Sequence, residues 1–186
     1  MFSTAVAQEE GSLSGERVVV HIMAVILACA ACVSDLRSRR IPNSLILLGA
    51  LAGVVMNTLD SGFQGTGRSL AGAGLGLALL FPFYALGGMG AGDIKLIAAL
   101  GSLAGPADVV KLALAAALAG GALAVSVAAW EGRLRETLHG VRTLLSFWLR
   151  EGVKPSPVLT LQNPSALKIP YALPIAVGAL AVALTS

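Results

Sequence analysis

The stretch VVKLALAAALAGGALAVSVAAW, residues 109–130, decides the fold class. It runs for 22 residues with Lys111 as its one charge, and a helix of about 20 apolar residues crosses the hydrocarbon core of a bilayer. Similar apolar blocks recur along the chain, whose 186 residues are 56% hydrophobic and 12% charged. A soluble domain carries about 25% charged residues. This composition therefore excludes a soluble globule and predicts a polytopic membrane protein.

The membrane-embedded part is predicted to be an all-α helix bundle. The chain has 22 glycines and only 5% aromatic residues, and small residues let membrane helices approach closely. The alternation of polar and apolar residues that marks a barrel strand is missing. We expect a single membrane domain over residues 1–186 with six transmembrane helices, at 18–33, 44–59, 69–87, 94–105, 109–130 and 169–185.

The charges of the connections predict the orientation of these helices. The first, third and fifth connections hold ten of the 13 Lys and Arg residues, whereas the opposite side has Arg17, Arg68 and Lys111. Because positive loops stay in the cytoplasm, both termini are expected to face outward. The span 94–105 is short, but a mere dip into the membrane there would move most basic residues outside. The net charge of +3 is too small to indicate nucleic-acid binding.

The largest cytoplasmic connection, residues 131–168, has two predicted parts. From Leu134 onward, helical spacing puts two kinds of residue on different faces: the apolar Leu138, Val141, Leu145 and Trp148, and the polar Arg135, His139, Arg142 and Arg150. This pattern is typical of a helix that lies on the membrane surface with basic side chains toward lipid phosphates. The stretch 154–164 contains three prolines and is predicted to be a loop.

Four other residues that are able to carry chemistry are interpreted as ordinary. Cys29 and Cys32 form a CxxC inside an apolar run, without a second pair of cysteines or histidines beside them. We therefore expect no metal site and no redox chemistry, and we interpret both as small packing residues. Asp60 and Asp108 fall near the outer ends of helices, where we expect solvated charges.

Asp35 and Asp93 are the two acidic residues that the topology places together. Taken alone, Asp35 balances the three arginines that follow it, and Asp93, which follows four glycines in six residues, caps the next helix. In the predicted topology, however, Asp35 ends a helix that runs inward and Asp93 begins one that runs outward. Both are therefore expected at the cytoplasmic face.

Two carboxylates at one depth are able to share a single proton, because two like charges that close do not ionise together. The ionised member then takes a proton from water, and the protonated member donates a hydrogen bond to the scissile carbonyl. This is the chemistry of an aspartic protease, and it needs no metal and no cofactor.

The residues that surround the two aspartates resemble those of type IV prepilin peptidases. Gly90-Ala91-Gly92-Asp93 matches the GxGD motif of that family, and Asp35 with Arg40-Ile41-Pro42-Asn43 matches its other aspartate motif. Pro170-Tyr171-Ala172-Leu173-Pro174 is similar to the pattern in its last span. The resemblance implies that Asp35 and Asp93 are catalytic. The glycine run, with Gly90 and Gly92, is then expected either to admit the substrate peptide beside Asp93 or to let this segment move and bring the aspartates together. Lys95 is expected to anchor the helix at the interface.

Within this family the chain looks most like the short branch that processes Flp-type or Tad prepilins. About 17 residues precede its first predicted span, and Cys29 and Cys32 lie within that span, whereas long members carry paired cysteines in a cytoplasmic segment and also methylate the pilin. We therefore expect a peptidase without methyltransferase activity. The resemblance implies a bacterial inner-membrane enzyme with periplasmic termini, a prepilin with a short basic leader as substrate, and a pilus, type II or Tad secretion apparatus as partner.

Two other classes of function fit parts of the sequence. Asp93 in a glycine-broken segment is compatible with a small proton- or cation-coupled transporter, in which broken helices carry carboxylates. The position of both aspartates near one face, and the lack of a duplicated half, argue against this alternative. A non-enzymatic assembly protein of a secretion apparatus would instead use the basic surface helix for docking.

Overall fold

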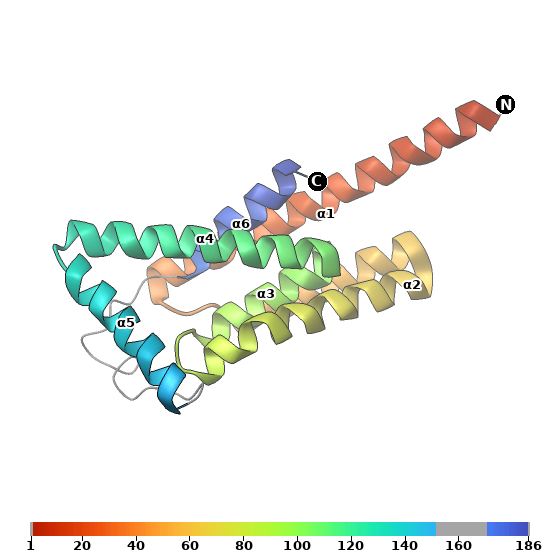
Figure 1. Ribbon diagram of the computed structural model, residues 1–186. Helices are drawn as coiled ribbons and strands as arrows, with labels where there is room; N and C mark the ends of the chain where they lie inside the picture. The colour runs from red at the N-terminus through yellow and green to blue at the C-terminus, as the bar shows by residue number, and fades with distance from the viewer. Residues whose placement is uncertain (1, 152–170, 186) are drawn as a thin grey trace.

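The computed structural model describes residues 2–151 and 171–185, and these ranges form six helices and no strand (Figure 1). The helices are α1 Phe2–Ser38, α2 Asn43–Ala85, α3 Ala91–Ala104, α4 Pro106–Trp130, α5 Leu134–Glu151 and α6 Ala172–Thr185. Three segments are long and apolar enough to cross a membrane, namely Val18–Ser38, Asn43–Ala85 and Pro106–Trp130, and α6 is a shorter apolar helix. The all-α membrane bundle predicted from the sequence is confirmed.

Helix α2 contains two of the predicted spans as the two arms of a hairpin. Ser61 and Gly62 have non-helical backbone angles, and Gly62 has a φ of 58°, which glycine adopts without strain. The expected connection 60–68 is wrong in extent, because helical geometry resumes directly after Gly62. Near the turn the arms are tied by a 2.8 Å hydrogen bond between the hydroxyls of Thr58 and Thr66.

Helix α3 packs against both arms of α2 with its backbone in direct contact. A β-carbon on Gly53 would lie 2.6 Å from backbone atoms of Ser102 and Leu103, and one on Gly72 would lie 2.0 Å from the carbonyl oxygen of Gly101. Small residues on α2 therefore let α3 pack closely between the two arms of the hairpin. The side chains of α3 form the centre of the core, in which Leu96, Ile97, Leu100 and Leu103 are fully buried.

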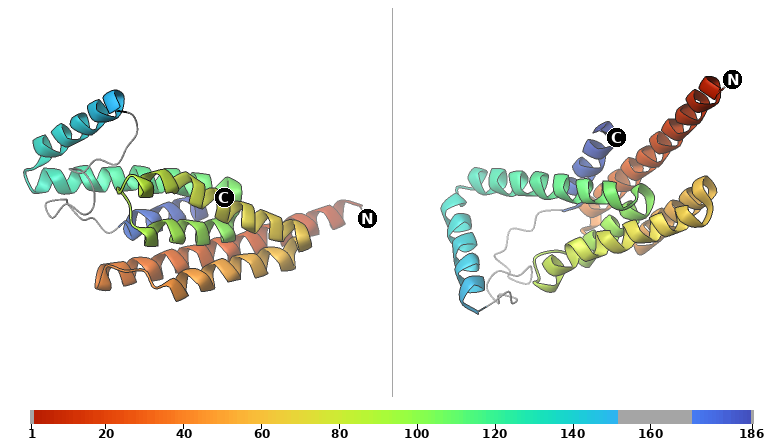
Figure 2. Two further views of the ribbon diagram at one scale, coloured as in Figure 1. Left: turned by 90° about the horizontal axis from the view of Figure 1, so that it is seen from below. Right: turned by 45° about the vertical axis from the view of Figure 1, so that its right-hand side comes forward.

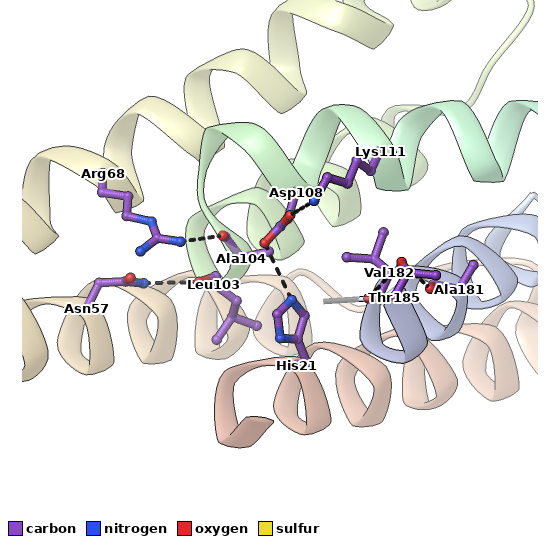
Figure 3. Close-up of polar contacts among 10 residues, drawn as sticks. All are labelled: His21, Asn57, Arg68, Leu103, Ala104, Asp108, Lys111, Ala181, Val182 and Thr185. Atoms are coloured by element: carbon purple, nitrogen blue, oxygen red, sulfur yellow. Dashed lines mark hydrogen bonds and ion pairs between the residues drawn. The ribbon is translucent and has the colours of Figure 1, made fainter. Parts of the chain in front are cut away.

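Polar side chains fix the C-terminal end of α3, where helix carbonyls have no partner within the helix. Asn57 Nδ2 donates to the carbonyl oxygens of Ser102 and Leu103, both at 3.1 Å. Arg68 donates to that of Ala104 at 3.4 Å, and Figure 3 shows this bond and the one from Asn57 to Leu103. The Ser69 hydroxyl donates to the Ser102 carbonyl at 2.8 Å. These bonds satisfy buried carbonyls and hold α3 firmly in the hairpin.

The remaining helices complete the bundle and leave α5 apart from it. Helix α6 packs against α1 and α4, and α5 contacts only α4 among the described elements. Both views in Figure 2 show α5 at one end of the bundle and the N-terminus of α1 at the other. A helix thus forms where the amphipathic pattern predicts one, and Leu138, Val141 and Arg142 on it are exposed. Its place on the membrane surface stays a prediction. The predicted proline-rich loop and the side chains of Leu145, Trp148 and Arg150 lie outside the described residues.

Candidate active site

Asp35 lies in the last turn of α1, where the chain folds back sharply. The hydroxyls of Ser34 and Ser38 donate to the carbonyl oxygen of Arg40 at 3.0 and 3.2 Å, and the backbone N–H of Arg39 donates to the carbonyl oxygen of Asp35 at 2.7 Å. These bonds pin the segment after α1 against its last turn. The side chain of Asp35 is half-buried at the edge of this fold-back.

Asp93 occupies the first turn of α3, and its carboxylate accepts a hydrogen bond from the backbone N–H of Gly90, the residue at the N-cap. An acidic side chain in the first turn of a helix is also favoured by the helix dipole. A β-carbon on Gly90 would stand 3.0 Å from Oδ2 of Asp93. Gly90 has ordinary extended backbone angles, so its lack of a side chain matters for space beside the carboxylate.

The structure brings Asp35 and Asp93 to the same end of the bundle, opposite the α2 turn (Figures 1 and 2). Asp93 precedes the apolar stretch that begins at Ile94. Burial, reinforced by the negative charge of Asp35, raises the pKa of Asp93 from 3.8 to about 6, and the hydrogen bond from Gly90 opposes part of this rise. A carboxyl with this pKa exchanges its proton in mildly acidic solution, closer to neutral pH than an ordinary aspartate does, and acid–base catalysis uses groups of this kind.

The segment after Asp35 and the segment around Asp93 touch directly. A β-carbon on Gly92 would lie 3.6 Å from the β-carbon of Ile41, and Lys95 Nζ donates to Oδ1 of Asn43 at 3.2 Å. Lys95, predicted to anchor its helix at the interface, is therefore bonded to a residue of the other motif. The two aspartate motifs therefore meet in space although about 50 residues separate them in the sequence.

Tyr171, which precedes α6, belongs to the same region. It lies within electrostatic range of Asp93, and its hydroxyl oxygen would be 3.1 Å from a β-carbon on Gly120 of α4. Gly120 therefore gives the tyrosine ring room beside α4. Three segments singled out in the sequence, around Asp35, Asp93 and Tyr171, thus converge on one end of the bundle.

A second polar cluster lies at the other end of the bundle, and sequence reasoning missed it. His21 Nε2 lies 3.5 Å from Oδ2 of Asp108, and Lys111 Nζ lies 2.8 Å from Oδ1 (Figure 3). The side chain of Asp108 is only 14% exposed, so its interpretation as an ordinary solvated charge was wrong. A histidine inside a predicted span is the signal that points to such a partner, because buried polar groups in membranes are paired.

Among the described residues, no three His, Cys, Asp or Glu side chains gather in a way that could hold a metal ion. Cys29 and Cys32 are unpaired thiols on α1, the first exposed and the second buried. The buried position of Cys32 agrees with its interpretation as a packing residue.

Comparison with known proteins identifies the family. The model of the type IV leader peptidase family matches residues 22–125, which is more than half of the chain and contains both aspartates. The chain belongs to this family. Two similar relatives are the prepilin leader peptidase/N-methyltransferases of Burkholderia pseudomallei strains 1026b and K96243, each 34% identical over 125 residues. No solved structure matches the chain.

The match to these leader peptidases is partial in both directions. It covers 61% of this chain and 38% of each Burkholderia relative. The residues matched by the leader peptidase family run from α1 into α4 and include the fold-back after Asp35 and the glycine run before Asp93. Helices α5 and α6 lie beyond them.

Proposed function

We propose that the chain is an intramembrane aspartic endopeptidase in which Asp35 and Asp93 form the catalytic dyad. The observation that carries this proposal is the contact between the two aspartate motifs, through Ile41 with Gly92 and Asn43 with Lys95. This contact brings the C-terminal end of α1 close to the N-terminal end of α3. The chain in which it occurs belongs to a leader peptidase family.

The environments of the two carboxyls divide the work between them. Asp93, whose pKa is raised to about 6, is the member that keeps a proton and donates a hydrogen bond to the scissile carbonyl oxygen. Asp35 is the ionised member, which accepts a proton from the attacking water. The tetrahedral intermediate then collapses as the C–N bond breaks and Asp35 passes the proton that it took from water to the leaving amine, which restores the ionised Asp35. Gly90, which leaves space beside the carboxylate of Asp93, and Gly92 line the path of the substrate peptide.

The proposed substrate is a Flp-like prepilin, whose short basic leader is removed at the cytoplasmic membrane boundary. The Burkholderia relatives are named prepilin leader peptidases, and the likeness of this chain to the short Flp/Tad branch selects the class of prepilin. Such a substrate joins a basic leader to a hydrophobic helix, so its scissile bond lies at the end of a membrane helix, as the two aspartates do. The pilus or secretion apparatus that assembles the product is the proposed partner.

We propose peptidase activity alone, although the relatives are named for an N-methyltransferase as well. In this chain both cysteines lie within α1, and one of them is buried in its packing. Purified enzyme incubated with a Flp-type prepilin and S-adenosylmethionine tests both halves of the proposal. Mass spectrometry should show a pilin that has lost its leader and carries an unmodified N-terminus. An intact prepilin contradicts the peptidase, and an added methyl group contradicts the restriction to peptidase activity.

The proposed orientation places the dyad and α5 on the cytoplasmic side and both termini in the periplasm. The distribution of basic residues supports it. A single cysteine at the exposed position of Arg142, introduced into a chain in which Cys29 and Cys32 are serine, should resist a membrane-impermeant thiol reagent added to intact spheroplasts and react after lysis. Labelling of intact spheroplasts would reverse the orientation.

A further inference from the structure

Asn43 occupies the first turn of α2 but does not cap that helix. The N-cap residue is Pro42, and the helix start has no side-chain capping bond. Asparagine is among the residues that usually bond to the backbone at such a place. Here its amide oxygen instead accepts a hydrogen bond at 3.2 Å from Lys95, which lies 52 residues further along the chain. The side chain of Asn43 is therefore committed to a contact between helices.

Lys95 stands close to the positive end of α3, where the helix dipole disfavours a cation. A residue that is locally unfavourable points to a compensating role elsewhere. Among the described residues, the ion pairs closer than 4.0 Å do not include Lys95. Its hydrogen bond to Asn43 therefore connects it to the segment after α1.

Gly92 and Lys95 are three residues apart and share one face of α3. That face meets the segment after α1, because Gly92 packs on Ile41 and Lys95 bonds to Asn43. On the other side, the serine hydroxyls of α1 fix the same segment to the turn that carries Asp35. A continuous chain of contacts thus runs from Asp35 through residues 40–43 to the turn that carries Asp93.

We propose that Lys95 and Asn43 are positioning residues that set the separation between Asp35 and Asp93. The inference rests on the proposed function, in which that pair is catalytic. Loss of the bond lets the start of α3 move away from the segment after α1, with Gly92 and Ile41 as the remaining contact. The aspartates then share a proton poorly, while the binding of the substrate elsewhere is retained.

A crosslinking experiment tests this spacing without any substrate. The β-carbons at positions 41 and 92 would be 3.6 Å apart, within the range of about 3.5–4.5 Å for a disulfide. The full chain with Ile41→Cys and Gly92→Cys, and with Cys29 and Cys32 replaced by serine, should crosslink rapidly when an oxidant is added. Adding Lys95→Met or Asn43→Leu should slow crosslinking about two- to fivefold, as the loss of one exposed hydrogen bond permits. Lys95→Arg should restore most of the rate.

Lys111→Met is the matched control, because it removes a lysine bonded to Asp108 at the far end of the bundle. Its crosslinking rate should equal that of the parent. Equal crosslinking rates for the parent and Lys95→Met would overturn the proposal. The proposal would also fail if Lys111→Met slowed crosslinking as much as Lys95→Met does. A thermal melt in detergent confirms that each variant is folded, and Lys95→Arg provides a second test if Lys95→Met is not.

The kinetics of prepilin cleavage, measured on variants that retain Cys29 and Cys32, give the second test. Lys95→Met and Asn43→Leu should each lower kcat roughly tenfold with KM changed by less than about twofold, and the double variant should be no slower than either single one. Losses that multiply in the double variant, or a change confined to KM, would contradict positioning. If no variant and no parent cleaves prepilin, the proposed function fails, and the crosslinking rates alone decide the positioning.

Discussion

Oδ2 of Asp93 lies 3.0 Å from the place that a β-carbon on Gly90 would occupy, and the N–H of the same glycine donates a hydrogen bond to that carboxylate. Gly90 thus donates to the carboxylate of Asp93 and also leaves space beside it. Gly92, the other glycine of the GxGD motif, is different, because its β-carbon would make an ordinary contact of 3.6 Å with Ile41.

Gly90→Ala is expected to lower the rate of leader cleavage more than Gly92→Ala. The methyl group at position 90 must displace the Asp93 carboxyl by a few tenths of an ångström, which costs roughly tenfold or more in rate for a group that takes part in the chemistry. Gly92→Ala should stay within about threefold of the parent, since alanine also suits a helix. Initial rates on one prepilin decide the matter, and equal losses would show that position 90 does not act through Asp93.

The protonation of Asp93 should follow the pKa of about 6. Because this value lies above 3.8, the folded state binds more protons between these two values, and folding stability falls as the pH rises from 3.8 to about 6. The cleavage rate should likewise fall above about pH 6 as Asp93 loses its proton. Infrared spectroscopy of the protonated carboxyl band that is absent from Asp93→Asn measures the titration directly.

Asp35→Asn should shift that titration to lower pH, because it removes the negative charge that raises the pKa of Asp93. The shift is only partial, since burial is the larger cause. Asp60→Asn, at an exposed position by the α2 turn, is the control and should leave the midpoint unchanged. An unchanged midpoint in Asp35→Asn would mean that the two carboxyls do not sense each other.

Packing of α3 into the α2 hairpin predicts a sharp difference between two neighbouring glycines. A β-carbon on Gly72 would lie 2.0 Å from the carbonyl oxygen of Gly101, whereas one on Gly74 would meet nothing within 4 Å. Gly72→Ala should therefore destabilise the protein by about 1–3 kcal/mol or more through overpacking. Gly74→Ala should be neutral or slightly stabilising. Unfolding in mixed micelles measures both, and similar values would mean that the two helices are further apart than described.

The His21–Asp108 contact is expected to stabilise the far end of the bundle. Asp108→Asn removes the charge that faces His21 and Lys111, and it should cost about 1–3 kcal/mol because the side chain of Asp108 is 14% exposed. Lys111→Ala removes a partner that is 57% exposed and should cost less than about 1 kcal/mol. Melting temperatures of the two variants show which substitution destabilises the protein more. A larger loss from Lys111→Ala would show that the lysine, and not the histidine, is the main partner of Asp108.

Hydrophobic periodicity and charge placement were enough to predict the helical class and most helix positions. The predicted span 109–130 lies within α4, and the amphipathic pattern from Leu134 corresponds to α5. The turn of α2 was placed too broadly, because Ser61-Gly62 reverses the chain in two residues whereas the predicted spans left residues 60–68 as the connection. Glycine marks close helix contact as often as it marks a turn, and one sequence does not distinguish the two.

The candidate site was predictable as far as it depended on topology. Asp35 and Asp93 are at one end of the bundle because each belongs to a helix end on the same side. The bond between Lys95 and Asn43, and that between His21 and Asp108, join residues 52 and 87 positions apart. No periodicity links such pairs. Only the packing of α3 into α2, and of α6 against both α1 and α4, brings them within reach.

The central claim, a catalytic pair of aspartates, is tested most directly by single-turnover cleavage of a Flp-type prepilin by the parent enzyme, Asp35→Asn and Asp93→Asn. Asparagine keeps the shape of each side chain and removes its titratable carboxyl. Asp60→Asn is the matched control, and thermal melts verify that all four proteins are folded. Asp60→Asn should cleave at the parental rate, and each of the other two variants should lose about three orders of magnitude or more in rate. Cleavage by either Asp35→Asn or Asp93→Asn at a rate near that of the parent would show that the two aspartates are not a catalytic pair.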